Sequence, residues 1–386
     1  MNVATPSPSM AATSPVQVAP AYILDLPPYV PGRPPSAVLS DAAAMRMMAS
    51  NENPLGTSPR VVAAVQAAAA QAGTYPDPHG EAVKAALHAR LGVPADRVLL
   101  GSGSSELIDL VARTFLRAGD EAVYAQYAFM AYPLAIKIVG ATPVVVPAKA
   151  YGHDLEAMAA AVTDKTRLIF VANPNNPTGT CLSEGALRDF LGKVPAHIAV
   201  LLDEAYTEFL PAEQRVDSWA LVDDFPNVVV TRTFSKAYGL AGMRVGFAVA
   251  RPEMTALLNR VRPVFNVNVL AQAAAVAALD DLGFLEETFH ANREGMTQLS
   301  GEFDRLSLPR IPSAGNFITV DFSGQPLGAA EVFQRLMRAG FVVRPLAPYG
   351  LPHHLRVTIG TAQQNRDFIA ALQTVLDASS DEVGTA

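Results

Sequence analysis

The chain has 386 residues, and its 29 basic and 36 acidic side chains give a formal net charge of −7; half of the residues are hydrophobic and 17% are charged, which is typical of globular proteins. The negative charge argues against a nucleic-acid partner, and the single cysteine, Cys181, excludes an intramolecular disulfide or a thiolate metal cluster and fits a reducing compartment. No apolar segment approaches the ~20 residues of a membrane span, so we expect a cytoplasmic protein with no metal site and no membrane partner.

The first fifty residues are punctuated by proline and by small polar residues. Residues 1–20, rich in Ala, Pro, Ser and Thr, predict a flexible lead-in. Residues 21–52 contain too many prolines for a long helix and predict an N-terminal arm. Beyond the arm, residues 60–72 and 81–91 have the composition of helices.

Short apolar runs then alternate with segments that can form helices. Most of these runs are rich in β-branched residues and all are too short for a typical helix, so we expect strands. Strands and helices in alternation imply a mainly parallel sheet that is covered on both faces. The predicted strands are residues 98–100, 122–124, 143–146, 168–171, 198–202, 228–231 and 245–250.

After about residue 265 the pattern changes to a few strands separated from helices. We therefore expect an α/β protein with a large domain over 53–265, built on a mostly parallel seven-stranded sheet, and a smaller α+β domain over 266–386. The helices predicted in the smaller domain are residues 270–279, 285–306 and 329–339, and its strands are residues 317–320, 341–344 and 355–359.

Four groups of glycine and polar residues lie at the ends of predicted strands, where parallel α/β sheets bind their ligands. In residues 101–106 (GSGSSE), the glycines allow close backbone approach, and Ser104 and Ser105 are expected to cap the following helix. This segment is either a phosphate site at a helix N-terminus or a plain capped turn. Residues 173–179 (NPNNPTG) contain more turn residues than one turn needs, and their Asn side chains supply donors and acceptors.

The other two groups contain a carboxylate and an amine. Asp203 follows an apolar strand, where a buried charge is costly unless a positive partner or a helix cap meets it. Lys236 lies among small residues in the segment 231–239 (TRTFSKAYG), which makes it a candidate for a Schiff-base amine, although a surface lysine is the commoner case. Together the four groups offer phosphate donors, an anion, hydrogen-bond donors and an amine, which a phosphorylated aldehyde cofactor held by a lysine requires.

From about residue 26 to residue 376 the chain resembles the fold-type I aminotransferases that depend on pyridoxal 5′-phosphate. More narrowly, it is similar to the histidinol-phosphate aminotransferases. The motifs that carry the resemblance are residues 49–56 (ASNENPLG), 75–77 (YPD), 173–179, 203–206 (DEAY), 235–237 (SKA), 239–242 (GLAG) and 355–358 (LRVT).

The resemblance implies a role for each residue around the cofactor. Lys236 is expected to form the aldimine with pyridoxal phosphate and to move the proton between Cα and C4′. Asp203 would pair with the ring nitrogen, and Asn176 and Tyr206 would hydrogen-bond the phenolate oxygen. Tyr75 would reach the cofactor of the neighbouring subunit in a homodimer. The residues expected to hold the phosphate are Ser104, Ser105, Thr233, Ser235 and Arg244.

An aromatic ring is expected to stack on the cofactor, and here the chain departs from the family. Relatives usually have Pro-Thr-Tyr or Pro-Thr-Phe, whereas this chain has QYAFMAY at residues 126–132. We align Phe129 with the stacking ring because Tyr132 then falls at its usual spacing, and Tyr127 remains the alternative.

The resemblance also implies how an amino donor and a 2-oxo acid bind. Arg356 would bind the α-carboxylate, and Arg344 with Tyr29 would bind a substrate phosphate, while Asn53 would face the substrate. The implied reaction transfers the amino group of histidinol phosphate to 2-oxoglutarate, giving imidazole-acetol phosphate and glutamate by ping-pong kinetics in histidine biosynthesis.

Three other functions remain open on the same scaffold. An aromatic amino-acid aminotransferase is the main one, because an imidazole-acetol group and a benzyl group are both flat and compact. A threonine-phosphate decarboxylase shares much of the motif set. A cofactor-sensing regulator would need a DNA-binding domain, and residues 1–50 contain neither a helix-turn-helix pattern nor a basic patch.

Overall fold

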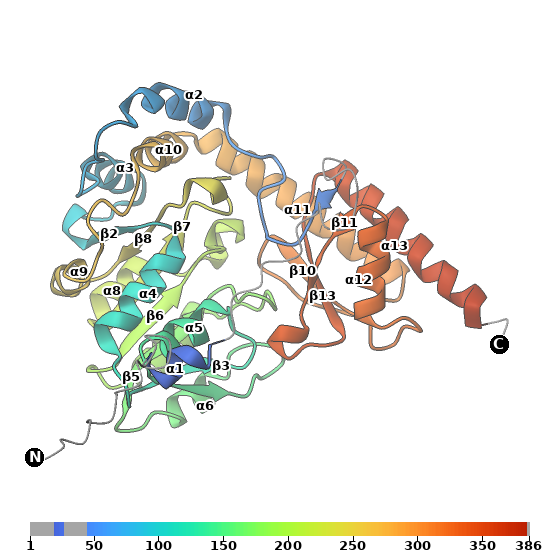
Figure 1. The fold of residues 1–386 in the computed structure, drawn as a ribbon, viewed down its shortest axis with the longest axis horizontal. Coiled ribbons are helices and arrows are strands. Elements are labelled where there is room, and N and C mark those ends of the chain that lie inside the picture. The colour runs from blue at the N-terminus through green and yellow to red at the C-terminus, as the bar shows by residue number, and fades with distance from the viewer. Residues whose placement is uncertain (1–18, 27–44, 384–386) are drawn as a thin grey trace, which may run out of the picture.

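The computed structural model describes residues 19–26 and 45–383, and Figure 1 gives its fold. Tyr29 and all but the last two residues of the predicted lead-in 1–20 lie outside the described residues. A short helix, α1 (Ala21–Leu24), precedes the gap and lies against α5 (Ala131–Ile138).

A seven-stranded sheet forms the centre of the larger part of the molecule, in the order β2-β8-β7-β6-β5-β3-β4. β8 runs antiparallel to both of its neighbours, and the other pairs of neighbouring strands are parallel. The prediction of a mostly parallel sheet is confirmed. Its strands are β2 (Val98–Gly101), β3 (Glu121–Ala125), β4 (Thr142–Val146), β5 (Thr166–Ala172), β6 (Ala199–Asp203), β7 (Val228–Thr233) and β8 (Gly246–Val249).

Helices cover both faces of this sheet because successive side chains of a strand point to opposite faces. Phe170 of β5 packs into a core with α4, α5 and α9, whereas its neighbour Ile169 packs into a core with α6, α7 and α8. A third core joins β2 and β8 to α2, α3 and α10. The helices of these three cores, besides α5, are α2 (Pro59–Ala68), α3 (Glu81–Leu91), α4 (Ser104–Phe115), α6 (Leu155–Ala160), α7 (Glu184–Leu191), α8 (Ser218–Asp224), α9 (Pro252–Asn259) and α10 (Val269–Asp280).

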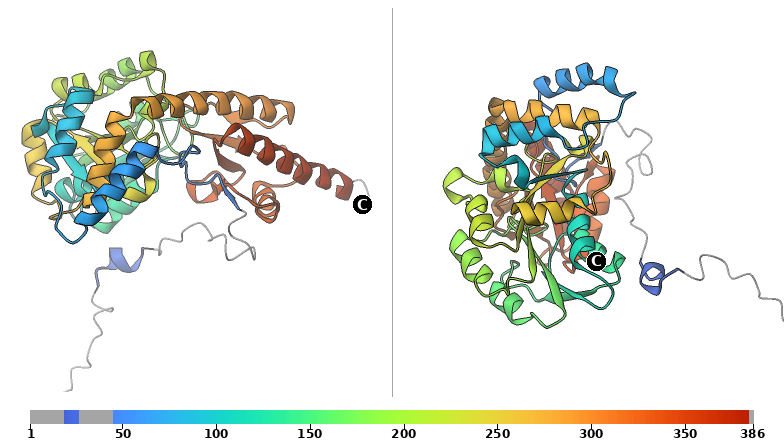
Figure 2. Two further views of the ribbon diagram at one scale, coloured as in Figure 1. Left: turned by 90° about the horizontal axis from the view of Figure 1, so that it is seen from above. Right: turned by 90° about the vertical axis from the view of Figure 1, so that its left-hand side faces the viewer.

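A separate core fills the C-terminal part, where α11 and α13 lie side by side (Figure 2). It packs helices against a four-stranded antiparallel sheet of order β12-β13-β10-β9. The last residues of the N-terminal arm pack with this C-terminal part. Strand β1 (Arg46–Met47) pairs with β11, and Met48 is buried in the core. Its elements are α11 (Leu282–Arg305), β9 (Arg310–Ile311), β10 (Phe317–Asp321), α12 (Ala329–Arg338), β11 (Phe341–Val342), β12 (Arg344–Pro345), β13 (His354–Thr358) and α13 (Ala362–Val383).

Three details differ from the sequence prediction. The strand expected at 341–344 is two strands in different sheets, with β11 paired to β1 and β12 paired to β13. Helix α10 follows the predicted boundary at 265 but packs its small alanine face on α2 and α3 of the larger part. Helix α4 begins at Ser104 behind the N-cap Gly103, so neither Ser104 nor Ser105 caps it with a side chain.

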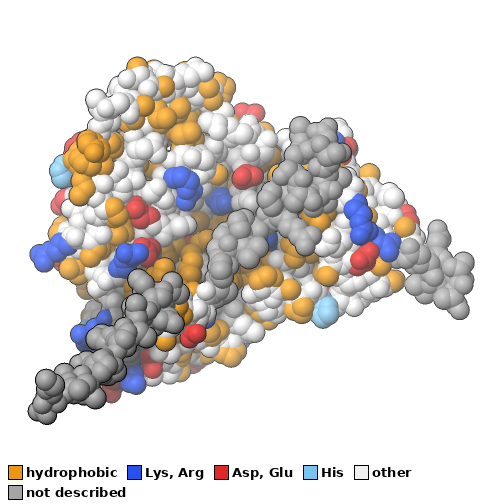
Figure 3. All heavy atoms as spheres, in the orientation of Figure 1, with side chains coloured by type: hydrophobic (Ala, Val, Ile, Leu, Met, Phe, Trp, Pro, Cys, Tyr) orange, Lys and Arg blue, Asp and Glu red, His pale blue; other side chains and the backbone are white. Residues whose placement is uncertain are grey.

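The charges on the molecular surface are mixed. Figure 3 shows basic and acidic side chains interspersed on one face of the molecule, without an extended patch of one sign. In the described part of the chain, no helix has both the length and the apolar character that a bilayer crossing requires.

Candidate active site

A cavity of about 200 Å³ lies at the carboxyl ends of the parallel strands, against the start of α4. Every residue predicted to contact the cofactor within its own chain lines this cavity, although the residues come from distant parts of the sequence. Parallel strands whose carboxyl ends meet at one edge of a sheet account for this convergence. These lining residues are Ser104, Ser105, Phe129, Asn176, Asp203, Tyr206, Thr233, Ser235, Lys236 and Arg244.

The amine of Lys236 reaches into this cavity from the segment after β7. Its Nζ donates a hydrogen bond to the carbonyl oxygen of Ser50 at 2.7 Å. Burial, together with the nearby guanidinium groups of Arg356 and Arg244, lowers the pKa of Lys236 to about 8, while the Glu52 carboxylate opposes this shift. A substantial fraction of the amine is therefore neutral near physiological pH, which is the form that attacks a carbonyl carbon.

Asp203 supplies the buried anion of the cavity as the last residue of β6. Only 5% of its surface is exposed. It accepts hydrogen bonds from the Tyr132 hydroxyl at 2.8 Å and the Thr231 hydroxyl at 3.3 Å. Burial raises the pKa of Asp203 to about 6, and these hydrogen bonds, together with the Ala205 amide, hold it from rising further. Asp203 is thus mostly ionised at neutral pH and can pair with a cationic nitrogen.

Tyr206 lies beside Asp203 and is oriented by a residue to which the sequence reasoning gave no role. The Asn51 side chain donates a hydrogen bond to the Tyr206 hydroxyl at 2.9 Å. Burial raises the pKa of Tyr206 to about 12, so the phenol keeps its proton at physiological pH. Asn51 belongs to the motif 49–56 and has a positive φ of 56°. The signal for Asn51 was therefore present in that motif, but its partner was not visible in the sequence.

One edge of the cavity suits an anion such as phosphate. The Thr233 hydroxyl hydrogen-bonds the Ser235 hydroxyl at 3.0 Å, and Arg244 Nη1 donates to Ser235 Oγ at 3.4 Å. The N-terminus of α4 faces the same edge through Ser104. A Cβ added at Gly103 would collide with the Arg244 guanidinium, so glycine allows the arginine to lie against this turn. Hydroxyls, a guanidinium and a helix N-terminus are the groups that bind phosphate in proteins.

The structure separates the two aromatic candidates for stacking. The Phe129 ring lines the cavity and meets the Tyr132 ring edge-on, with centroids 5.9 Å apart. Tyr127 instead packs with Leu346 and Leu351 of the C-terminal part, and it does not line the cavity. This placement favours Phe129.

Two arginines of the C-terminal sheet lie directly opposite each other, because Arg344 of β12 is the register partner of Arg356 of β13. Arg356 is buried, and its Nη atoms donate to Asn176 Oδ1 and to the Ala49 carbonyl, while its Nε has no partner among the described residues. Neither guanidinium forms an ion pair with a described carboxylate. Neighbouring like charges of this kind can be balanced by an anionic ligand.

Asn53 and Tyr75 do not line this cavity. The Asn53 amide donates to the Ala237 carbonyl at 3.0 Å and to the Thr288 hydroxyl at 2.9 Å, and its oxygen accepts from a backbone amide. These internal hydrogen bonds give the predicted substrate contact of Asn53 no support. Tyr29 lies outside the described residues. Tyr75 is 81% exposed and stacks on Phe265 away from the cavity of its own chain.

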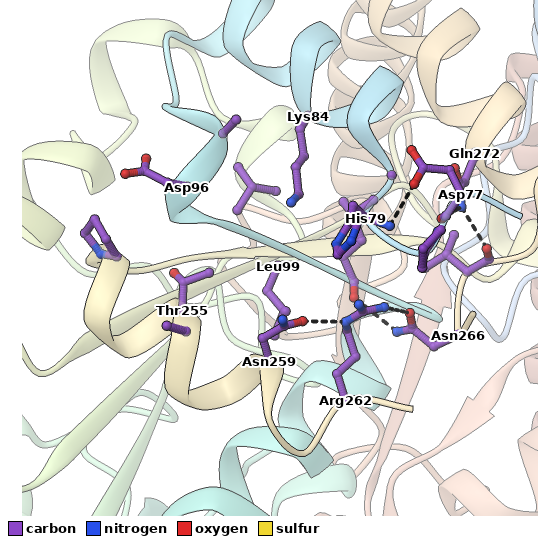
Figure 4. Close-up of a pocket in the computed structure, with 18 residues that line it drawn as sticks. Asp77, His79, Lys84, Asp96, Leu99, Thr255, Asn259, Arg262, Asn266 and Gln272 are labelled. Carbon is purple, nitrogen blue, oxygen red and sulfur yellow. Dashed lines mark hydrogen bonds between the residues drawn. The ribbon is translucent and has the colours of Figure 1, made fainter. Parts of the chain in front are cut away.

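A second cavity, of about 270 Å³, lies between α3, β2, α9 and the segment 262–272 (Figure 4). Its cations, Lys84 and Arg262, are accompanied by the carboxylates of Asp77 and Asp96. Asp77 of the motif 75–77 lines this cavity, but none of the residues predicted to contact the cofactor or a substrate does, so we place the candidate active site in the first cavity. In the described residues, no group of His, Cys, Asp or Glu side chains is arranged to hold a metal ion.

Comparisons with known proteins show which family this chain is similar to. Residues 45–372 match the family described as "Aminotransferase class I and II". The chain is 50% identical to Histidinol-phosphate aminotransferase 1 of Cupriavidus pinatubonensis, and the match covers 94% of this chain and 97% of that protein. It is 51% identical to Histidinol-phosphate aminotransferase 2 of Ralstonia nicotianae, and the match covers 94% of this chain and 98% of that protein. The structure of a histidinol-phosphate aminotransferase from Sinorhizobium meliloti in complex with pyridoxal 5′-phosphate superimposes with a TM-score of 0.85 at 28% identity, covering 96% of this chain and 99% of that one.

The pKa of Lys236 gives a direct test of this geometry. In the cofactor-free protein, acetylation of Lys236, followed by mass spectrometry of its peptide, should rise with pH around a midpoint near 8. Arg356→Gln should move the midpoint to higher pH, because it removes a positive charge that disfavours the ammonium form. Arg366→Gln, an exposed arginine elsewhere in the C-terminal part, should leave it unchanged. A wild-type midpoint near the ordinary value of 10.5 would contradict the described environment.

Proposed function

This chain belongs to the class I and II aminotransferase family, and from that membership we propose that it is a pyridoxal 5′-phosphate-dependent enzyme that transfers the amino group of histidinol phosphate to 2-oxoglutarate. The reaction class rests on one observation. An amine with a lowered pKa, Lys236, and a buried carboxylate, Asp203, line the same cavity. The curated relatives at about half identity support the substrate.

The residues of the cavity fit pyridoxal phosphate. Ser104, Ser105, Thr233, Ser235 and Arg244 provide the phosphate-binding edge. At the other end, Asp203 is the anion for the ring nitrogen, and the amine of Lys236 is available for covalent attachment. When bound, the cofactor withdraws electrons from the substrate Cα and carries the amino group between the two substrates.

The protein's own residues then perform proton transfer and orientation. Lys236 Nζ would carry the proton between the substrate Cα and C4′ of the cofactor. Asp203 keeps the ring nitrogen protonated, because an ionised carboxylate in a buried site strongly favours a cationic partner. Tyr206 and Asn176, which both line the cavity, would donate to the phenolate oxygen, and Phe129 would cover the ring. Because both substrates use one cofactor in turn, we expect ping-pong kinetics.

The two arginines of the C-terminal sheet support a pair of substrates, one with a carboxylate (glutamate) and one with a phosphate (histidinol phosphate). A guanidinium presents a planar fork of donors that matches a carboxylate or a phosphate. Arg356 reaches Asn176 of the cavity and so lies closer to the reacting atoms, where the α-carboxylate of glutamate would bind. Arg344 lies one strand further out and would meet the phosphate of histidinol phosphate. This arrangement favours a phosphorylated donor over a purely aromatic one.

A screen of amino donors tests the proposal. Purified protein loaded with pyridoxal phosphate should show its highest kcat/KM with histidinol phosphate when 2-oxoglutarate is the acceptor, and Lys236→Ala should show no turnover with any donor. A higher kcat/KM for phenylalanine would replace the substrate with an aromatic amino acid. Release of carbon dioxide from O-phosphothreonine would indicate a decarboxylase instead.

Removal of the Arg344 guanidinium should lower kcat/KM for one substrate far more than for the other. Arg344→Ala should lower kcat/KM for histidinol phosphate by about 10- to 100-fold, the effect of losing hydrogen bonds to a charged group, with a much smaller change for glutamate. Arg338→Ala removes an exposed arginine of α12 and serves as the control. An equal loss of kcat/KM for both substrates would show that Arg344 does not bind the phosphate specifically.

We further propose that the active unit is a homodimer in which Tyr75 contacts the cofactor phosphate of the neighbouring subunit. Tyr75 is 81% exposed and stacks on Phe265, whose neighbour in the chain, Val264, is 72% exposed. Exposed apolar side chains that gather on one surface commonly mark an interface. The cytoplasmic location stays a prediction from the sequence.

Mixing two defective variants tests the contribution of Tyr75. In a hybrid dimer of Lys236→Ala and Tyr75→Ala subunits, one of the two sites has both residues intact. Subunit exchange at equal amounts should therefore restore activity to about a quarter of the wild-type sites. Mixing Lys236→Ala with Arg244→Ala should restore nothing, because both residues act in the cavity of their own chain. Failure of the first mixture, with exchange verified, would exclude a contact of Tyr75 in trans.

A further inference from the structure

The contact between Tyr132 and Asp203 is not explained by the roles given so far. Tyr132, in the first turn of α5, donates its hydroxyl proton to Asp203 Oδ2 at 2.8 Å, which is a well-formed hydrogen bond. The other carboxylate oxygen accepts from Thr231 of β7 at the longer distance of 3.3 Å. Tyr132 is therefore the closer of the two side-chain donors to the buried anion.

Packing fixes the Tyr132 ring independently of this hydrogen bond. The ring is fully buried and stacks on the Phe170 ring, with centroids 4.8 Å apart and planes inclined by 13°. The Phe129 ring meets it edge-on at 5.9 Å. Because these contacts involve only the ring, Tyr132→Phe removes the hydroxyl and leaves the apolar packing in place. The hydroxyl is thus held at the carboxylate by the fold, with little conformational freedom left to lose.

The charged and titratable groups around Asp203 do not replace this donor. Glu204, the next residue in the chain, repels the Asp203 charge but is itself paired with Arg232 at 2.9 Å. Tyr132 and Tyr206 remain protonated, because burial raises the pKa of each phenol. On the adjacent strand, Ala172 donates its amide to His153, whose pKa burial lowers to about 4. The remaining charged groups that line the cavity are Glu52, Lys236 and Arg244.

We propose that Tyr132 is a positioning residue whose hydroxyl keeps Asp203 ionised and aimed into the cavity, and that it thereby sets the acid limit of the reaction. The effect on the reaction rests on the proposed function, because the carboxylate must be charged to hold a protonated ring nitrogen. The effect on Asp203 itself rests only on the geometry of the chain.

The direction of the pKa change in a Tyr132 variant follows from the two opposing influences on the Asp203 carboxyl. Burial has already raised the pKa of this carboxyl to about 6, and the Tyr132 hydrogen bond opposes that rise. Without the hydroxyl, the charged form loses a donor that water cannot easily replace in a buried site, so the neutral form persists to higher pH. A donor to an ionised group is worth enough to expect an upward shift of about one pH unit, a tenfold change in the ionisation constant.

The first measurement uses the cofactor-free protein. The carbonyl band of protonated Asp203 is followed against pH by infrared difference spectroscopy and assigned by its loss in Asp203→Asn. We expect Tyr132→Phe to move the midpoint up by about one pH unit. Tyr124→Phe is the matched control, because Tyr124 is a buried residue of β3 in the same core and its hydroxyl makes no hydrogen bond to any described residue.

A second variant at the same position keeps the test valid if Tyr132→Phe folds poorly. Replacing Tyr132 by 3,5-difluorotyrosine makes the phenol a stronger donor and should move the Asp203 midpoint down. In the enzyme loaded with pyridoxal phosphate, the acid limb of the pH profile of kcat should move in the same direction as the Asp203 midpoint in each variant.

Two outcomes would overturn the proposal: an unchanged Asp203 midpoint, or an acid limb that stays in place while the midpoint moves. A wild-type protein that takes up no pyridoxal phosphate would instead refute the proposed function, and the cofactor-free titration would still decide the role of Tyr132.

Discussion

A carboxylate buried at the end of an apolar strand is the constraint around which the site is arranged. Moving an ionised group out of water costs several kcal/mol unless hydrogen bonds and opposite charges offset that cost. At Asp203 the offset comes from three separate elements: the Tyr132 hydroxyl of α5, the Thr231 hydroxyl of β7 and the backbone after β6. The anion can remain in the cavity because the parallel sheet brings the ends of these elements together.

The segment 48–53 has a comparable role for the cationic groups. It links the two parts of the molecule, with Met48 buried in the C-terminal core and Asn51 hydrogen-bonded to Tyr206 in the segment after β6. The Ser50 carbonyl accepts from Lys236 and the Ala49 carbonyl accepts from Arg356. A short stretch of backbone therefore positions both the amine and the guanidinium, and movement of one core relative to the other would alter the site.

Local sequence patterns were enough to predict the sheet and most of the candidate site. Each short apolar run corresponds to a strand, and apart from the partly exposed edge strand β4 these strands are largely buried, because a strand covered on both faces must be apolar along its length. Lys236, Asp203 and Asn176 could be singled out because polar residues at or after the ends of such strands reach the ligand edge of a parallel sheet, whereas Arg244 was assigned through the family resemblance. The resemblance to a known family then assigned each of them a role.

Pairings between distant residues could not be predicted from the sequence. The bonds from Tyr132 to Asp203 and from Asn51 to Tyr206 join residues 71 and 155 positions apart, and the internal hydrogen bonds of Asn53 span 184 and 235 positions. The division of 341–344 between two sheets and the packing of α10 on α2 depend equally on distant partners. The sequence determines which residues can form strands, turns and charged sites, because those are local properties of the chain. Only the tertiary structure decides which polar groups meet, because each buried donor or acceptor must be satisfied by whatever the rest of the fold places beside it.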